Sequence, residues 1–306
     1  HFIPHPVNVD TKILFHNRYT NKLEEEKVYG DRWLKFIYTN PFGKLCLWAL
    51  VKRAFFSKWY GWRMNQNASS AKILPFIQEY SLDTTDFADK VSSFKNFNEF
   101  FFRKLTTSSR PIEKSLETIV FPADGRHLGF QNVDETKQVF VKGQKFNLEK
   151  LFGSKELAQP FNGGSLILSR LCPVDYHRFH LPTNGRLHSV ELINGHLFSV
   201  NPIALRQSLS IFWRNKRYLT LIENEHLGQV AVFLVGATCV GSVHLTAQKS
   251  QSYDKGDELG YFSFGGSSVI TVFQPGKIKL EDELLQVSSR GYEYYAKMGE
   301  VMGRFL

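Results

Sequence analysis

From Pro111 onward, short hydrophobic runs alternate with turn residues along the chain. The runs are rich in β-branched and aromatic residues, and four of them are Val139–Val141, Ser165–Leu168, Val230–Val235 and Val269–Phe273. Glycine-containing turn signals fall between the runs: Asp124-Gly125, Asn162-Gly163-Gly164, Asn184-Gly185 and Asn194-Gly195. Runs of this length with these breaks are typical of strands joined by turns. The pattern therefore predicts a mainly antiparallel β core over residues 111–306.

Before Pro111 the pattern changes to a helical one. Residues 71–105 continue in a helical mode, with element starts near Ser81-Leu82-Asp83 and Asn98-Glu99. Arg110-Pro111-Ile112 marks the exit from this part of the chain. We therefore expect an α+β protein in which a helical N-terminal region, residues 1–110, precedes the β core.

Within that region, Asp31 to Arg63 interleaves basic and aromatic residues. The basic and aromatic positions are Arg32, Lys35, Lys44, Lys52, Arg53, Lys58 and Arg63, with Trp33, Phe36, Trp48, Phe55, Phe56, Trp59 and Trp62. The uncharged run from Leu45 to Val51 is too short to span a bilayer, and the cations do not gather on one helical face. Two interpretations stay open: an aromatic layer covered by Lys and Arg stems, or a membrane-facing surface.

Composition narrows the classes of partner. The 306 residues are 42% hydrophobic and 22% charged, as in an ordinary globular protein, and the net charge of +9 favours an anionic partner. The three cysteines, Cys46, Cys172 and Cys239, have no paired spacing. A disulfide framework and a cysteine zinc site are therefore disfavoured, and a reducing compartment is expected.

Gly265-Gly266-Ser267-Ser268 lies between two strand-like runs. The simpler interpretation is a glycine bulge between strands. The chemical alternative is self-cleavage, because a serine hydroxyl directly after glycine meets little steric resistance in turning back on its own preceding carbonyl.

Two further stretches carry groups that such chemistry needs. Cys172 to His180 contains Asp175, His177 and His180, and imidazole is the usual proton shuttle near neutral pH. The two histidines have structural, acid–base or metal-binding interpretations, and a metal site would need ligands such as His188, His196 or His244. Asp124 follows Pro122-Ala123, so the chain supplies Asp, His and Ser in that order. It lacks the GxSxG elbow, a P-loop and a GxGxxG after a strand, which disfavours α/β-hydrolases and nucleotide enzymes.

Taken in order, these stretches resemble the motifs of the phosphatidylserine decarboxylase family. The matching segments are Pro122-Ala123-Asp124-Gly125, Asp175–His180, Phe198–Asn201, Val235–Ser242 and Gly266-Ser267-Ser268. Asn98–Arg103 and Phe273–Lys277 are similar to further family segments, so the resemblance covers residues 95–306. One departure is Gly265, where many members carry leucine.

The resemblance implies a precursor that cleaves itself between Gly266 and Ser267. It would yield a β chain (1–266) and an α chain (267–306), with Ser267 converted into a covalent pyruvoyl cofactor. The family's triad maps onto Asp124, His180 and Ser267, with Asp175 as a second acid near His180, whose carboxylate partner favours the protonated imidazole.

The implied reaction is decarboxylation of phosphatidylserine. Its amine would form a Schiff base with the pyruvoyl group, and His177 is the candidate acid that reprotonates the product, phosphatidylethanolamine. The resemblance implies no metal and no nucleic acid. It places the protein peripherally on an anionic membrane facing a reducing compartment, the cytoplasmic side of the cell membrane if bacterial, and we add a homodimer as an expectation. The alternatives are a membrane-associated serine hydrolase and a lipid-binding protein with an uncleaved Gly-Ser bend.

Overall fold

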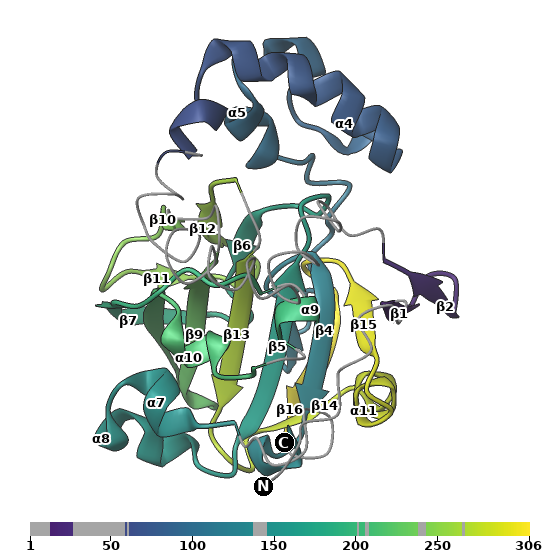
Figure 1. Ribbon diagram of the computed structural model, residues 1–306. Coiled ribbons are helices and arrows are strands. Elements are labelled where there is room, and N and C mark those ends of the chain that lie inside the picture. The colour runs from purple at the N-terminus through teal and green to yellow at the C-terminus, as the bar shows by residue number, and fades with distance from the viewer. Residues whose placement is uncertain are drawn as a thin grey trace, which may run out of the picture.

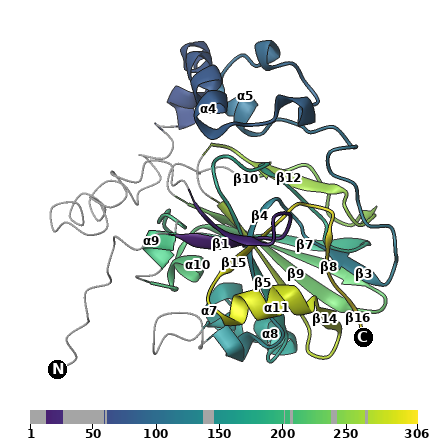
Figure 2. The same ribbon diagram turned by 90° about the vertical axis from the view of Figure 1, so that its right-hand side faces the viewer.

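The computed structural model describes residues 13–26, 59, 61–136, 146–200, 202–205, 208–237, 243–264 and 267–306. A large β-sheet forms the centre of the molecule, and a helical cap lies above it (Figure 1). Small helices cover one face of the sheet, and two small sheets with helix α11 cover the other (Figure 2). The predicted α+β class with a mainly antiparallel β core is confirmed.

The large sheet has ten strands within the described residues. In spatial order they are β11 (Ser252–Tyr253), β7 (Gly185–Ile193), β8 (Arg217–Asn224), β9 (Gly228–Gly236), β13 (Ser267–Phe273), β5 (Ser165–Leu171), β4 (Gly125–Phe130), β15 (Glu293–Ala296), β1 (Leu14–Asn17) and β2 (Lys22–Glu25). Neighbours pair antiparallel except β1 and β15, which are parallel. Predicted runs 165–168, 230–235 and 269–273 all lie in central strands, whereas 139–141 is outside the described residues.

The small sheets lie against the opposite face from the small helices. Their strands are β10 (Val243–Leu245), β12 (Glu258–Phe262) and β6 (Arg178–His180) in one, and β14 (Ile278–Leu280), β16 (Val301–Phe305) and β3 (Thr118–Val120) in the other. The helical elements of the core are η5 (Val133–Glu135), α7 (Leu148–Phe152), α8 (Lys155–Ala158), η6 (Gln159–Phe161), α9 (Pro202–Leu205), α10 (Ile211–Arg214) and α11 (Asp282–Ser289).

Each central strand contributes to two hydrophobic cores. On β5, Leu166 and Leu168 face the core shared with α7, α9 and α10, while Ile167 faces the core shared with the small sheets and α11. Successive side chains of a strand point to opposite faces, so both faces demand apolar residues. This explains why the central strands appear as continuous hydrophobic runs instead of alternating ones.

The cap consists of η2 (Asn67–Lys72), α4 (Ile73–Tyr80), η3 (Thr84–Asp86), η4 (Val91–Ser93) and α5 (Phe97–Phe101). Its core is largely aromatic and comprises Met64, Ile73, Phe76, Phe87, Phe97, Phe100, Phe101 and, from the far end of the chain, Phe264. Helix α5 begins after Asn96, whose side chain accepts a hydrogen bond from the Glu99 N–H. The helical interpretation of residues 71–105 agrees with this part of the fold.

The first described residues form a β hairpin, although the sequence placed them in a helical region. Strands β1 and β2 pair through a turn that contains Asn21 at φ 52°, and Phe15 is buried against Tyr295. Strands of four residues carry too little periodicity to be recognised, and what stabilises them is a distant edge of the sheet. Most of the basic–aromatic segment lies outside the described residues. Among the helices that are described, none combines the length and apolarity needed to cross a bilayer.

Candidate active site

The topology brings three of the predicted stretches to one end of the large sheet. Ser267 is the first residue of β13 and pairs with Gly236 on β9 and Leu171 on β5. Cys172–His180 continues directly from Leu171, and Asp124 immediately precedes β4, the other neighbour of β5. Gly125 permits the close approach of β4 to β5, because a Cβ there would lie 2.5 Å from the Arg170 carbonyl oxygen.

The Gly-Ser bend connects two different sheets. Strand β12 ends at Phe262 in a small sheet, and β13 begins at Ser267 in the large sheet, so the flanking strands do not pair with each other. Gly265 and Gly266 lie outside the described residues. A bulge between paired strands, the simpler sequence interpretation, therefore does not describe this connection.

Ser267 is fully buried at this junction. Its Oγ has no hydrogen-bond partner within the described structure, and the same holds for the Oγ of Ser268. A buried hydroxyl is nearly always hydrogen-bonded, because leaving it unpaired costs about 1–3 kcal/mol. Ser267 does not differ from Ser268 in this respect, so its position directly after Gly266 is what makes its hydroxyl the candidate nucleophile.

His177 is fully buried and electrically neutral at physiological pH. Its Nδ1 lies 2.9 Å from the Asp175 carbonyl oxygen, and its ring lies on the Phe101 ring at a centroid distance of 3.8 Å. Because a carbonyl only accepts, Nδ1 carries the proton and Nε2 keeps a lone pair. That Nε2 is buried and unpartnered within the described residues. Burial lowers the pKa of His177 to about 3.

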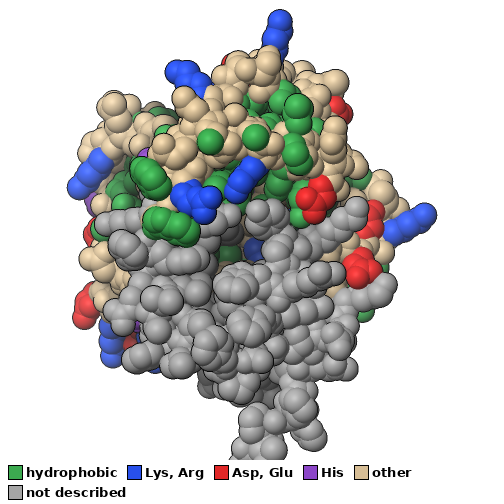
Figure 3. Space-filling view, turned by 45° about the horizontal axis from the view of Figure 1, so that its top comes forward, with side chains coloured by type: hydrophobic (Ala, Val, Ile, Leu, Met, Phe, Trp, Pro, Cys, Tyr) green, Lys and Arg blue, Asp and Glu red, His purple; other side chains and the backbone are tan. Residues whose placement is uncertain are grey.

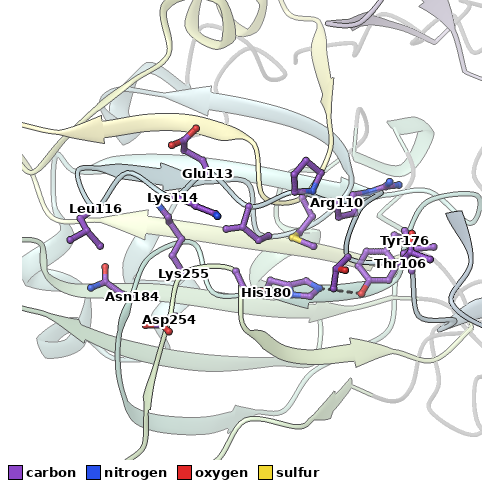
Figure 4. Close-up of a pocket in the computed structure, with 16 residues that line it drawn as sticks. Thr106, Arg110, Glu113, Lys114, Leu116, Tyr176, His180, Asn184, Asp254 and Lys255 are labelled. Carbon is purple, nitrogen blue, oxygen red and sulfur yellow. Dashed lines mark hydrogen bonds between the residues drawn. The ribbon is translucent and has the colours of Figure 1, made fainter.

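His180 lines a cleft of about 730 Å³ (Figure 4). The chain that leaves the cap, from Leu105 to Thr107, also lines this cleft. Its Nδ1 lies 2.8 Å from the Gly256 carbonyl oxygen, and its Nε2 lies 3.3 Å from the Tyr176 hydroxyl. Burial lowers the pKa of His180, and the negative charges of Glu258 and Asp124 offset only part of that effect. The carboxylates thus favour the protonated ring, as expected from the sequence, but burial has the larger effect.

Asp124 is buried behind the same cleft and is neutralised by an arginine. Both carboxylate oxygens accept from Arg110 Nε, at 2.9 and 3.0 Å, and Oδ1 also accepts from the Met298 N–H at 2.9 Å. Figure 4 shows Arg110, Tyr176 and His180 at one end of the cleft, and Leu116, Asn184 and Asp254 at the other.

Asp175 lies in a buried network of charged groups. Its carboxylate accepts from Arg126 Nη1 at 3.0 and 2.7 Å and from the Cys172 N–H at 2.6 Å. Burial raises the pKa of Asp175, and the Arg126 charge opposes that shift. The network continues through Glu26, which is ion-paired with Arg126 and Arg170.

His180 and Arg110, the ion-pair partner of Asp124, thus line one cleft, while Asp175 and His177 follow β5, the strand that pairs with Ser267. Within the described residues, no hydrogen bond joins Asp124, His180 and Ser267 to one another. The sequence reasoning also missed Arg110, Arg126 and Tyr176. Arg126 and Tyr176 lie close in sequence to the selected acids and histidines, whereas Arg110 is 14 positions from Asp124 and gave no such signal. Arg126 pairs with Asp175 instead of its sequence neighbour Asp124.

The metal-binding interpretation of the histidine pair finds no donor set here. The described ranges contain no group of three or more His, Cys, Asp or Glu side chains arranged to hold a metal ion. One of the proposed extra ligands, His188, pairs with Glu223 on the exposed side of β7 and β8.

Comparisons with known proteins identify the family. The phosphatidylserine decarboxylase family profile matches residues 97–304. Proteins named phosphatidylserine decarboxylase proenzyme from Fusobacterium nucleatum subsp. nucleatum and Clostridium kluyveri are each 40% identical over 292 and 291 residues, which is 95% of this chain and 97% and 98% of theirs. A third, from Clostridium novyi, is 40% identical over 94% of this chain and 97% of its own length. The chain therefore belongs to the phosphatidylserine decarboxylase family.

Proposed function

We propose that this chain is a precursor that cleaves itself between Gly266 and Ser267 and then decarboxylates phosphatidylserine. The observation that carries the proposal is the buried, unpartnered Oγ of Ser267 at the point where the chain passes between two sheets. The name proenzyme, borne by the relatives, supports processing into two chains.

The cleavage step needs only groups of the chain and one water molecule. Ser267 Oγ attacks the Gly266 carbonyl carbon, and the peptide nitrogen leaves as the free amine of Ser267, so the amide becomes an ester. Removal of the Ser267 Cα proton then expels the Gly266 carboxylate and leaves dehydroalanine. Water converts this residue into a pyruvoyl group and releases ammonia. We assign His180 as the base, because burial keeps its imidazole neutral, with Asp124 as the nearby acid of the triad. Asp175, which we expected as a second acid near His180, pairs with Arg126 instead.

Residue 267 is a fitting place for the group that would result. Ser267 is fully buried and its Oγ has no hydrogen-bond partner within the described residues, so losing that oxygen breaks no side-chain hydrogen bond described there. The carbonyl of a pyruvoyl group there would take up the substrate amine and accept the electron pair as carbon dioxide leaves. We assign the reprotonation of the product to His177. Because His177 is neutral with a lone pair on Nε2, it must first receive a proton at that atom.

The fold would hold the two products of cleavage together. Strand β13 of the α chain lies between β9 and β5 of the β chain, and β15 pairs with β1 and β4. Backbone hydrogen bonds on both sides of two strands keep residue 267 in place after the bond before it is cut. A homodimer remains a prediction.

The decarboxylase activity is tested directly with lipid. We expect the purified protein to convert phosphatidylserine in mixed vesicles to phosphatidylethanolamine, with release of carbon dioxide from the serine carboxylate. Labelled carboxyl carbon and thin-layer separation of the lipids measure both products. Pretreatment with a hydroxylamine-type carbonyl reagent should abolish turnover, because the reactive group is a ketone. Turnover that persists after treatment with that reagent would contradict the proposal. So would the absence of turnover in fully cleaved protein.

We further propose that residues 1–110 attach the protein to an anionic membrane, on the cytoplasmic side if bacterial, while residues 111–306 catalyse the reaction. Figure 3 shows hydrophobic side chains among Lys and Arg on the cap. Large exposed hydrophobic residues there are Trp59, Trp62 and Leu74, and the Arg63 guanidinium lies 5.4 Å from the Trp59 ring centroid. Rings mixed with cations suit a headgroup layer.

Neutralising Lys52, Arg53 and Lys58 to glutamine should weaken binding to anionic vesicles about tenfold or more at low salt. Each cation near such a surface contributes ~1 kcal/mol, which salt reduces. Vesicle sedimentation across a salt series measures the effect. The matched control neutralises Lys155, Lys279 and Arg304. These residues belong to α8, β14 and β16, which lie at the end of the molecule opposite the cap (Figure 1). Equal weakening in both triple variants would show a general charge effect and no membrane-facing segment.

A further inference from the structure

Helix α5 contacts two segments of the candidate active site: the histidine stretch and the chain that leads to the Gly-Ser bond. Phe101 lies against the His177 ring on one side and the Phe264 ring on the other, with centroid distances of 3.8 and 4.9 Å. Phe97 contacts Phe264 at 5.2 Å. The residue after the helix, Phe102, accepts a hydrogen bond from Arg178 Nε at 3.0 Å. One short helix thus packs against both the histidine stretch and the chain that leads to the Gly-Ser bond.

The most specific of these contacts is polar. The Phe264 N–H donates to Asn98 Oδ1 at 2.9 Å, and both residues are buried. Asn98 Nδ2 donates to Asn65 Oδ1 at 2.7 Å, which turns the amide so that its oxygen faces Phe264. An amide with both ends engaged is held in one rotamer, and its oxygen gives the buried Phe264 N–H a fixed acceptor.

We propose that Asn98 is a positioning residue for self-cleavage, fixing the chain at Phe264 two residues before Gly266. This inference rests on the proposed function. The other end of the segment is fixed independently, because Ser267 enters the ladder of β13 between β9 and β5. With Phe264 and Ser267 both held, we expect the Ser267 hydroxyl to meet the preceding carbonyl more often than it would in a chain held at one end only.

The expected size of the effect follows from the geometry that attack requires. Reacting atoms must approach to about 3–3.5 Å with their orbitals aligned, and a displacement of about 1 Å can cost about 100-fold in rate. Loss of a hydrogen bond that holds the reacting segment in place is therefore expected to cost up to about 100-fold in rate. Asn98 bonds to neither Ser267 nor His180 in the described structure, so it acts through the placement of Phe264.

The experiment follows cleavage of the full-length chain made by cell-free synthesis, quenched over time and resolved on denaturing gels. Asn98→Leu keeps the volume but loses the acceptor, and cleavage should slow by up to about 100-fold. Asn98→Asp keeps the acceptor, while the Asn65 amide can rotate to donate to the second oxygen, so most of the rate should return. If Asn98→Leu does not fold, Asn98→Ser replaces it, since its shorter hydroxyl cannot reach the Phe264 N–H.

Asn96→Ala is the matched control. It removes the hydrogen bond that begins α5 and so lowers the stability of the same helix, but it leaves the Asn98–Phe264 contact in place. We expect near-normal cleavage in this variant despite a lower melting temperature. Slowing equal to that of Asn98→Leu would overturn the inference, as would wild-type cleavage in Asn98→Leu. A wild-type chain that never cuts itself would instead refute the proposed function.

Discussion

Replacing Ser267 by alanine is expected to leave a single chain of 35.3 kDa and no decarboxylase activity. Without Oγ the Gly266 carbonyl cannot be transferred from nitrogen to oxygen, so neither the cut nor the ketone at residue 267 can form. Denaturing gels and the labelled-lipid assay measure the two losses. The substitution removes one buried atom without a hydrogen-bond partner in the described structure, so folding should persist.

Ser268→Ala is the matched control for this variant. Ser268 is the next residue of β13, is equally buried, and also has an Oγ without a partner among the described residues. We expect it to cut and to decarboxylate near the wild-type rate. A cut in the Ser267→Ala chain between residues 266 and 267 would point to an external protease. Loss of cutting in Ser268→Ala alone would move the nucleophile by one residue.

His180→Ala should slow self-cleavage about 100- to 10,000-fold, the usual contribution of a positioned general base. The direction in which the cleavage rate changes with pH follows from the burial of His180. A base works in its neutral form, and the pKa of His180 lies below the ordinary value of 6.5. The wild-type rate should therefore persist below pH 6.5 and fall only as the pH drops through that lowered pKa. Time courses of cleavage from pH 4 to 8 measure it.

His177→Ala is the companion variant, and its expected result differs. This chain should cut itself, because His177 is assigned to the second reaction, but decarboxylation should be lost. The alternative result, an uncut His177→Ala chain beside a cut His180→Ala chain, would exchange the two assignments. One observation favours the exchanged assignment: within the described structure, the Nε2 of His177 is buried and has no hydrogen-bond partner, so it could accept a proton.

The β core was predictable because its strands are buried on both faces. Runs such as Val230–Val235 place alternate residues in two different cores, and they stand out from any polar background. The hairpin of β1 and β2 was not predictable, since Phe15 is buried by Tyr295 from the opposite end of the sequence. The pattern of hydrophobic residues around Phe15 does not reveal a partner so far away in the sequence.

The candidate site divides in the same way. The order of Asp124, the histidine stretch and Ser267 predicted the candidate residues, and the sheet brings their segments to one end. The partners of these residues could not be predicted. Arg110 forms an ion pair with Asp124, and Arg126 forms one with Asp175, and both pairs exist only because the fold brings the residues together. The anchoring of Phe264 in the cap was equally hidden, because nothing in the sequence relates it to Asn98.

The chemical state of residue 267 tests the central claim most directly. Intact-mass analysis of the shorter chain, followed by fragmentation and reaction with a ketone-specific hydrazide, identifies its first residue. We predict a chain that begins at residue 267 with a pyruvoyl group in place of serine, that labels with the hydrazide and that resists Edman degradation. A free serine at that position, or an intact chain in fully folded wild-type protein, would contradict the account.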